Sequence, residues 1–324
     1  MTLQRVFQTC LILIVFGLVG LTDAAETYPT RPIKVIVSYP AGGANDIIAR
    51  SIGEELTKDM GQPIVVENKS GAAGTVGADA AAKSLPDGYT LLMAAGAHAL
   101  APSLHKNLTY DLIKDFQPIS LAAIGTYMLV VHPSVKATSV KELIALAKAN
   151  PGKLNYASSG VGAPPHLAGV LFQKMTGTQL THIPYRGDTP AITDLIAGQV
   201  QLAFISPGPL LPHVQAGKLR ALAMTSPKRS AILPDLPTLD EAGLKGYALG
   251  TWWGLLAPAG TSKTMIDRLA ASMAKATSVA AIKERFTKLG FEAQGSTPAE
   301  FAAFIKEEVA RYAEIAKAAG IEPK

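Results

Sequence analysis

The sequence predicts an α/β protein with two lobes, each of them a β-sheet covered by helices. Short β-rich runs alternate with amphipathic segments from residue 33 onward, an order typical of parallel sheets with right-handed crossovers. The alternation restarts near Tyr127, which indicates a second unit. The last 60 or so residues show a helical pattern without strands of their own, so we expect them to fold back over the first sheet.

In the first unit, three apolar runs bounded by Gly, Pro or Asn predict strands at Ile33–Val37, Ile64–Glu67 and Thr90–Ala94. Residues 46–60 predict a helix, because Ile, Ile, Leu and Met recur there every four positions on one face. The stretch "GAAGTVGADAAAKSL", residues 71–85, predicts a helix of small residues packed closely between the second and third strands.

In the second unit, five strands are predicted in "MLVVHP", "LNYAS", "THIPY", "QLAFI" and "LRALAMT". Ser139 and Glu142 form a capping-box pattern that opens a helix, and Pro151-Gly152 ends it. A second helix is predicted over "PHLAGVLFQKM". A third is predicted over "PAITDLIAG", with Thr189 as its N-cap. Thr297 and Glu300 predict another capping box in the C-terminal region.

Two segments must cross between the units, one near Ala123–Val130 and one near Tyr247–Leu255. We therefore expect residues 26–126 and 248–324 to form lobe 1, and residues 127–247 to form lobe 2. A ligand cleft is expected between the lobes, because α/β sheets bind ligands at the carboxyl ends of their strands. Trp252 and Trp253, in the second crossing segment, are expected in the core rather than in a cleft wall.

The N-terminus predicts an exported protein. Arg5 precedes the 12-residue apolar run "CLILIVFGLVGL", and "TDAAE" follows it, a pattern typical of a secretory signal peptide, residues 1–25, cleaved after Ala24 or Ala25. An uncleaved anchor is the alternative. Cleavage removes Cys10, the single cysteine of the chain, and with it any thiol nucleophile. The predicted location is a bacterial periplasm.

Composition argues against several classes of function. The net charge of +5 comes from scattered basic residues, so no nucleic-acid surface is expected, although a mild positive bias helps to collect anions. The six histidines show no i,i+4 pair and no HExxH motif, so no metal site is predicted. The glycines of "GAAGTVG" lack the spacing of dinucleotide and P-loop motifs, and close helix packing explains them better. We expect no cofactor.

Two glycine-rich loops each join a strand to a helix. "SYPAGGANDIIAR", residues 38–50, places Gly42 and Gly43 directly before a helix start, where backbone N–H groups attract anions. A tight βα turn with Asp46 as an early-helix acid is the alternative interpretation. "YASSGVGAPPHL", residues 156–167, repeats the strand–loop–helix pattern in the second unit.

The second loop also raises an enzymatic alternative. Ser158 and Ser159 are placed like a nucleophile elbow, but the Gly-x-Ser-x-Gly spacing is missing. Hydrogen-bond donation from hydroxyl and N–H groups suits the loop better than catalysis. For His166, a structural bond at the helix start is favoured over a catalytic role.

Several long stretches carry a family resemblance. "RPIKVIV", "YPAGG", "GQPIVVENKSGAAGTVGADAAAKSLPDGYTLL", "KLNYASSGVGAPPHLAG" and "IPYRGDTPAITDLIAGQVQLAF" resemble the Bug-type extracytoplasmic solute receptors of tripartite tricarboxylate transporters, over the whole mature chain. The resemblance implies a type II periplasmic binding protein fold, a small organic carboxylate as ligand and no enzymatic chemistry. It also implies membrane subunits of a tripartite transporter as partners. We expect a monomer and no nucleic-acid partner.

The resemblance also implies the site. In such receptors the loop Tyr39–Asp46 and the loop Ser158–Gly162 hold a carboxylate between the lobes, and the stretches Ala95–His98 and Tyr185–Gly187 lie beside them. The predicted ligand-binding residues are Tyr39, Ala41, Gly42, Gly43, Asn45, Asp46, Ala97, His98, Ser158, Ser159, Gly160, Gly162, His166, Tyr185, Arg186, Gly187, Ile205 and Ser206.

One position departs from the family pattern. Family members usually have Asp at the end of "QLAFI", where this chain has Ile205 followed by Ser206. Because that acid suits an ammonium group, its loss favours carboxylic acids over amino acids as ligands. The alternative functions are a secreted α/β hydrolase using Ser158 or Ser159, and a ligand receptor for a membrane signalling system.

Overall fold

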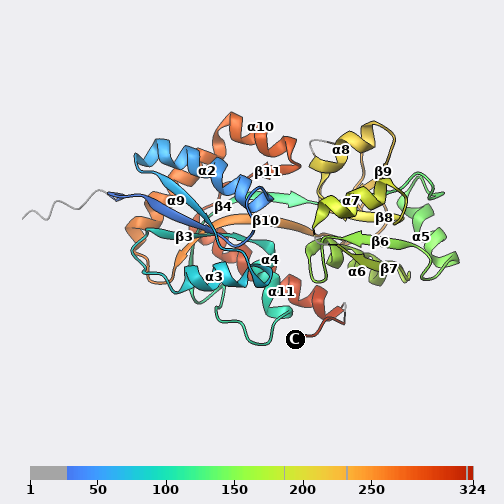
Figure 1. The fold of residues 1–324 in the computed structure, drawn as a ribbon, viewed down its shortest axis with the longest axis horizontal. Helices are drawn as coiled ribbons and strands as arrows, with labels where there is room; N and C mark the ends of the chain where they lie inside the picture. The colour runs from blue at the N-terminus through green and yellow to red at the C-terminus, as the bar shows by residue number, and fades with distance from the viewer. Residues whose placement is uncertain (1–27, 186, 231–232, 319, 324) are drawn as a thin grey trace, which may run out of the picture.

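The computed structural model describes residues 28–185, 187–230, 233–318 and 320–323. The predicted signal peptide and Arg186 therefore lie outside the described residues. Figure 1 shows two α/β bodies placed end to end along the long axis of the molecule. We call the first sheet with its helices lobe 1 and the second sheet with its helices lobe 2. No helix of the described residues has the length and apolarity needed to cross a membrane.

The first sheet has six strands in the order β11-β4-β10-β3-β1-β2. Strands β1 (Ile33–Val37), β2 (Ile64–Asn68) and β3 (Thr90–Ala95) are parallel, as predicted. The long strands β4 (Phe116–Thr126) and β10 (Gly250–Pro258) are antiparallel to each other and lead into and out of lobe 2.

The short strand β11 (Phe291–Ala293) corrects the expectation that the C-terminal region has no strand. It pairs with β4 at the edge of the sheet, and three residues are too few to show an alternating pattern.

The second sheet has five strands in the order β7-β6-β8-β5-β9. All five overlap the predicted runs, and their bounds are β5 (Met128–Val131), β6 (Asn155–Ser158), β7 (Thr181–Pro184), β8 (Leu202–Ile205) and β9 (Arg220–Met224). Strands β6, β7 and β8 run parallel, while β5 is antiparallel to both β8 and β9. The carboxyl ends of β6 and β8 carry the predicted loop residues Ser158 and Ser206.

The helices surround the two sheets (Figure 1). Those of lobe 1 are α2 (Ala44–Met60), η2 (Ala72–Gly74), α3 (Thr75–Ala82), α4 (Gly96–Leu100), η3 (Ala101–Ser103), α9 (Lys263–Ser278), α10 (Ala280–Lys288) and α11 (Pro298–Ala318). Those of lobe 2 are α5 (Val140–Ala149), α6 (Pro164–Thr176), α7 (Asp188–Ile196) and α8 (Pro207–Gln215). Helices α9 and α11 contact β4, so the C-terminal region does fold back onto the first sheet.

Helix starts follow the predicted capping chemistry with one exception. Glu142 N–H donates to Ser139 Oγ at 3.2 Å, and Thr297 N–H donates to Glu300 Oε2 at 2.8 Å. Helix α7 starts two residues earlier than predicted, because Gly187 rather than Thr189 is its N-cap. Gly187 has φ +109°, a conformation that glycine tolerates and threonine does not. Asp188 thereby becomes the first residue of α7.

Close packing explains the glycines between β2 and β3. A Cβ at Gly77 would lie 2.6 Å from Ser38 Oγ and 2.8 Å from the Lys69 carbonyl oxygen, so α3 packs directly on the end of β1 as predicted.

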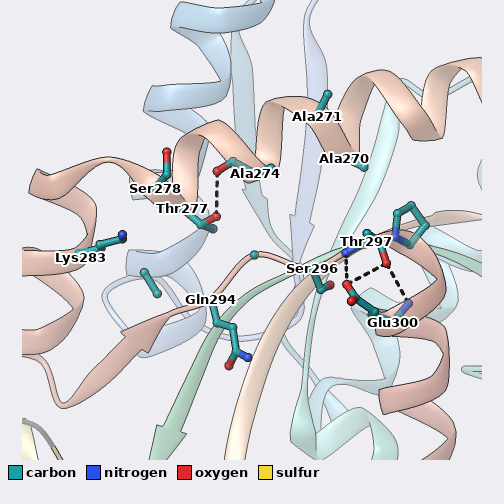
Figure 2. Close-up of a pocket in the computed structure, with 13 residues that line it drawn as sticks. Ala270, Ala271, Ala274, Thr277, Ser278, Lys283, Gln294, Ser296, Thr297 and Glu300 are labelled. Atoms are coloured by element: carbon teal, nitrogen blue, oxygen red, sulfur yellow. Dashed lines mark hydrogen bonds between the residues drawn. The ribbon is translucent and has the colours of Figure 1, made fainter.

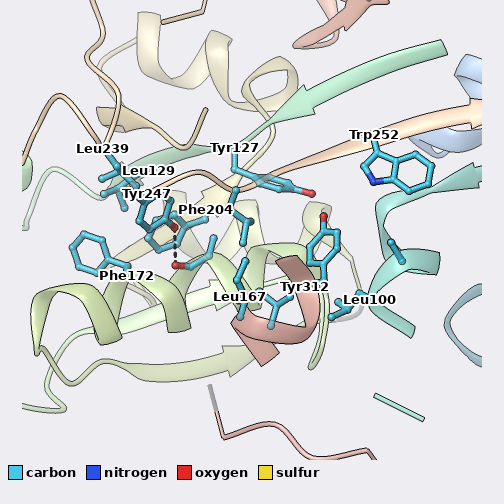
Figure 3. Packing of buried hydrophobic residues seen from close by; sticks show 14 of the residues in the cluster. Leu100, Tyr127, Leu129, Leu167, Phe172, Phe204, Leu239, Tyr247, Trp252 and Tyr312 are labelled. Atoms are coloured by element: carbon cyan, nitrogen blue, oxygen red, sulfur yellow. Dashed lines mark hydrogen bonds between the residues drawn. The ribbon is translucent and has the colours of Figure 1, made fainter. Parts of the chain in front are cut away.

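The core continues through the junction between the lobes. Trp252 and Trp253 are both buried, as predicted. Figure 3 shows Trp252 and Leu100 of lobe 1 close to Tyr312, while Tyr127 and Leu167 line the lobe 2 side. A few polar groups lie within this apolar junction, and they form part of the candidate site.

Candidate functional site

The first glycine-rich loop is an exposed turn that is stabilised by hydrogen bonds to the buried side chain of Asp46. Gly42 has φ +81°, and Gly43 is the N-cap of α2 with φ −78°. Asp46 organises the turn, because its Oδ2 accepts from Gly42 N–H and its Oδ1 accepts from Asn68 Nδ2, both at 3.0 Å. Burial opposes its charge, but hydrogen bonds from Arg50, Gly42 and Asn68 prevail and lower the pKa of Asp46 to about 2. Asp46 therefore shapes the loop, and Ala41, Gly42 and Gly43 stay exposed.

Asn45 offers a free donor beside this loop. Its Oδ1 accepts from the indole nitrogen of Trp253 at 2.5 Å. Its Nδ2 has no hydrogen-bond partner among the described residues, although Asn45 is only 8% exposed. A buried donor without a partner is costly, and such groups in native proteins commonly await a ligand, water or ion.

A second lobe 1 element, the start of α4, places His98 and Ala97 near the same loop. His98 Nδ1 accepts from Ala95 N–H at 3.0 Å, which leaves the ring proton on Nε2. Nε2 faces the Gly74 backbone but makes no well-formed hydrogen bond with a described residue. Burial lowers the pKa of His98 to about 4, so the ring is neutral at pH 7. Its ring packs edge-on against Tyr39 at 5.8 Å between centroids.

Two histidines anchor the second glycine-rich loop through hydrogen bonds. Ser158 Oγ lies 2.6 Å from His182 Nε2 and 3.0 Å from the Gly160 carbonyl oxygen. Gly162 N–H donates to His166 Nδ1 at 3.1 Å, and the His166 and His182 rings stack at 4.2 Å. His166 thus has the structural role that the sequence favours.

These bonds limit what the second loop can offer a ligand. Gly160 N–H is used by Ser158 Oγ, and Gly162 N–H by His166. Pro164 and Pro165 open α6 and have no N–H group. The hydroxyl group of Ser159 is engaged as well, because it donates to the Asp188 carboxylate.

The Ser158–His182 contact is the strongest structural feature for the hydrolase alternative, and sequence reasoning missed it. Ser158 is 0% exposed, however. A serine nucleophile must reach a substrate carbonyl, and this hydroxyl is buried beneath its own loop. The contact is better explained as a loop anchor.

A group of polar residues lies where the chain crosses between the lobes. We call this group the hub, and its members are Tyr127, Thr251, Tyr312, Ser159 and Asp188. Tyr127, between β4 and β5, is buried and hydrogen-bonds the side chain of Thr251 in β10. Burial, followed by the neighbouring charges of Tyr312, Asp188 and Tyr39, holds the pKa of Tyr127 well above its usual range. Figure 3 shows the hydroxyl groups of Tyr127 and Tyr312 directed toward one another. Residues from both lobes therefore meet at the Tyr127 hydroxyl.

The start of α4 lies beside the hub. A Cβ at Gly96 would lie 2.9 Å from Tyr312 Oη and 3.2 Å from Thr251 Oγ1. The predicted stretch Ala95–His98 therefore adjoins the crossing segments directly.

Lobe 2 contributes Ser159 and Asp188 to the hub. Gly187 N–H donates to the Ser159 carbonyl oxygen at 3.3 Å, which joins the two stretches. The Ser159 hydroxyl donates to the Asp188 carboxylate. Asp188 Oδ1 is buried and has no hydrogen-bond partner among the described residues. Burial raises the pKa of Asp188, and the Ser159 bond opposes this only in part.

Three predicted residues lie apart from the hub. Tyr185 Oη donates to Asp194 Oδ2 of α7 at 2.7 Å. Ile205 is 0% exposed and lies in the lobe 2 core with Ala157 and Leu210. Ser206 is half-buried at the N-cap of α8.

Sequence reasoning missed Tyr127, Thr251 and Asp188. Tyr127 and Thr251 lie inside the two predicted crossing segments, so polar residues at a predicted hinge were the available signal. Asp188 carried no such signal, because an acid at a helix start is common.

A groove lies elsewhere, on lobe 1 between α9, α10, β11 and the start of α11 (Figure 2). Its volume is about 680 Å³, and small residues such as Ala270, Ala274 and Gly295 line it. Several of its polar side chains are engaged locally, as in the Thr297–Glu300 capping box. None of the predicted site residues lines it. Within the described parts of the chain, no group of three or more His, Cys, Asp or Glu residues is arranged to hold a metal ion.

Comparisons with known proteins agree on one family. The pattern of the "Tripartite tricarboxylate transporter family receptor" matches residues 48–321. Protein BugT of Bordetella pertussis is 36% identical over 326 residues, and the alignment covers 100% of both chains.

Two solved structures match closely. The periplasmic binding protein BugD is 37% identical with a TM-score of 0.79, covering 92% of this chain and 100% of that one. A Rhodopseudomonas palustris protein, described as "R. palustris Rpa4515 with adipate", is 34% identical with a TM-score of 0.82, covering 92% and 100%. The predicted α/β fold of a periplasmic binding protein is thereby confirmed.

Proposed function

Because the chain belongs to the tripartite tricarboxylate transporter receptor family, we propose that it captures a small organic carboxylate in the periplasm for the membrane subunits of such a transporter. The observation that carries this proposal is the group of unpartnered donors near the junction, above all Asn45 Nδ2 and His98 Nε2. The exposed loop at the start of α2 adds backbone N–H groups. A site rich in donors suits a ligand rich in acceptors, and a carboxylate is such a ligand.

The donors are neutral, which suits a receptor that must release its ligand. Each hydrogen bond to a charged group contributes about 1.5–3 kcal/mol. Three or four such bonds, less the cost of ordering and closure, are compatible with about −8 kcal/mol, the free energy of micromolar binding. Adipate, which is named in the description of the R. palustris relative, is also a small organic carboxylate.

The finer assignments form part of the proposal. Lobe 1 comprises residues 26–126 and 248–324, and lobe 2 residues 127–247, a division that the two sheets support. Residues of the two glycine-rich loops and of the stretch Ala95–His98 contact the ligand or shape the loops that contact it, whereas Tyr185, Ile205 and Ser206 lie apart from the hub. The protein acts as a monomer without enzymatic activity, after removal of residues 1–25.

The proposed ligand carries no ammonium group. The acid that the family usually has at the end of β8 is absent from this chain, because Ile205 is apolar and packs in the lobe 2 core and Ser206 is neutral. A buried ammonium without acceptors loses its hydration at a cost of several kcal/mol.

The function is tested by calorimetric titration of the purified protein with succinate, adipate and benzoate. We expect micromolar affinity for at least one acid and no measurable binding of its methyl ester, because the ester lacks the charge that the donors recognise. Hydrolysis of p-nitrophenyl acetate is measured on the same sample. Absence of binding to any acid, or turnover of the ester with loss of activity in Ser158→Ala, would contradict the proposal.

A further inference from the structure

Asp188 is a half-buried acid with one carboxylate oxygen, Oδ1, that is buried without a hydrogen-bond partner among the described residues. Its carboxylate accepts from Ser159. Asp46 provides the contrast, because both of its oxygens accept hydrogen bonds within the loop that it shapes. An acid that served only to start α7 would be expected to turn its oxygens to solvent or to the first N–H groups of the helix.

The position of Asp188 points to the ligand. It lies next to Ser159 in lobe 2, and its charge acts on the Tyr127 hydroxyl at the crossing between the lobes. The Tyr127 hydroxyl forms a hydrogen bond with the side chain of Thr251, and Thr251 lies beside the start of α4. Asp188 Oδ1 is therefore an unpartnered acceptor beside a site whose other unpartnered groups are mainly donors.

We propose that Asp188 accepts a hydrogen bond from a hydroxyl group of the ligand, so that the receptor prefers hydroxy acids to the corresponding plain acids. This inference rests on the proposed function, because it names a second group on the same carboxylate ligand. Burial of the acid disfavours its charge when the site is empty, and a ligand hydroxyl supplies the missing partner.

A hydroxyl fits this acceptor better than an ammonium group does. A hydroxyl donates one hydrogen bond and also accepts, whereas an ammonium has three donors and accepts none. Asp188 Oδ1 is one unpartnered acceptor, and the neighbouring groups of Ser159 and Tyr127 are neutral hydroxyls.

The test compares matched pairs of acids by calorimetry: succinate with malate, glutarate with 2-hydroxyglutarate, and benzoate with salicylate. In the wild type we expect the hydroxy member of at least one pair to bind about tenfold tighter or more. Asp188→Ala should abolish that ratio by weakening the hydroxy member of the pair more than the plain member, since only the hydroxy acid donates to Oδ1. Asp235→Ala, which removes an exposed acid of lobe 2, should keep the ratio.

The outcomes separate the two proposals. If plain acids bind and no hydroxy member binds tighter, or if Asp188→Ala weakens both members of a pair equally, the role of Asp188 is wrong and the proposed function stands. If aspartate binds tighter than malate, Asp188 pairs with an ammonium group and the hydroxyl assignment is overturned. If no acid of the panel binds, the proposed function fails and this inference fails with it.

Discussion

Gly43→Val is expected to weaken carboxylate binding by about 100-fold or more while leaving the protein folded. A Cβ at Gly43 would have only the Pro40 carbonyl oxygen within 4 Å, at 3.5 Å, and its φ of −78° is open to valine. The free energy of unfolding should therefore fall by about 1 kcal/mol or less. A branched side chain at the start of α2 would cover the exposed N–H groups and remove about two charge-assisted bonds.

Calorimetric titration and urea unfolding measure these two effects separately. Gly43→Ala should show an intermediate loss of affinity, because a methyl group covers less of the backbone. Ala259→Val, in an exposed turn of lobe 1, should leave affinity unchanged. Unchanged affinity in Gly43→Val would remove the first loop from the site. The strained position is Gly42, with φ +81°, and not Gly43, so the predicted effect comes from blocked access alone.

Acidification from pH 6.5 to pH 4 is expected to lower the free energy of unfolding by up to about 3 kcal/mol through His98 alone. Burial lowers the pKa of this 1% exposed ring from 6.5 to about 4 in the folded protein. Between these two values the unfolded chain binds a proton that the folded protein does not. Stability is therefore complete above about pH 6.5 and falls as the pH approaches 4.

Urea unfolding at several pH values measures this loss. His98→Asn is the matched control, because an amide oxygen can replace Nδ1 as acceptor for Ala95 N–H without titrating. The variant should show a shallower pH dependence between 6.5 and 4. Asp46 does not interfere, since its pKa of about 2 places its contribution below pH 4. An equal slope in wild type and variant would show that His98 does not carry the effect.

Most of the fold could be predicted from local patterns. The parallel strands β1 to β3 and the five strands of lobe 2 are apolar runs bounded by turn residues, and burial on both faces makes such runs conspicuous. The two features that the sequence did not predict have the same physical cause. Strand β11 is defined by pairing with β4 at a sheet edge, and the cap of α7 is set by the φ of Gly187. Both depend on tertiary context that a short stretch does not encode.

The sequence predicts which loops form the site, but it does not predict which side chains contact one another there. Glycine-rich turns before helices mark where backbone is exposed, which located Gly42 and Gly43. The sequence does not show that Ser158 is anchored by His182, 24 residues away. Nor does it show that the charge of Asp188 acts on the Tyr127 hydroxyl at the crossing between the lobes. The first contact arises from the pairing of β6 with β7, and the second arises where the two lobes join.

A crystal structure of the protein with a bound carboxylic acid tests the central claim most directly. We expect electron density for the acid between the lobes, with one carboxylate group at the Gly42–Gly43 loop and its other end near Ser159, Asp188 and Tyr127. Ligand density in the groove along α9, or on one lobe without contact to the other, would contradict the account.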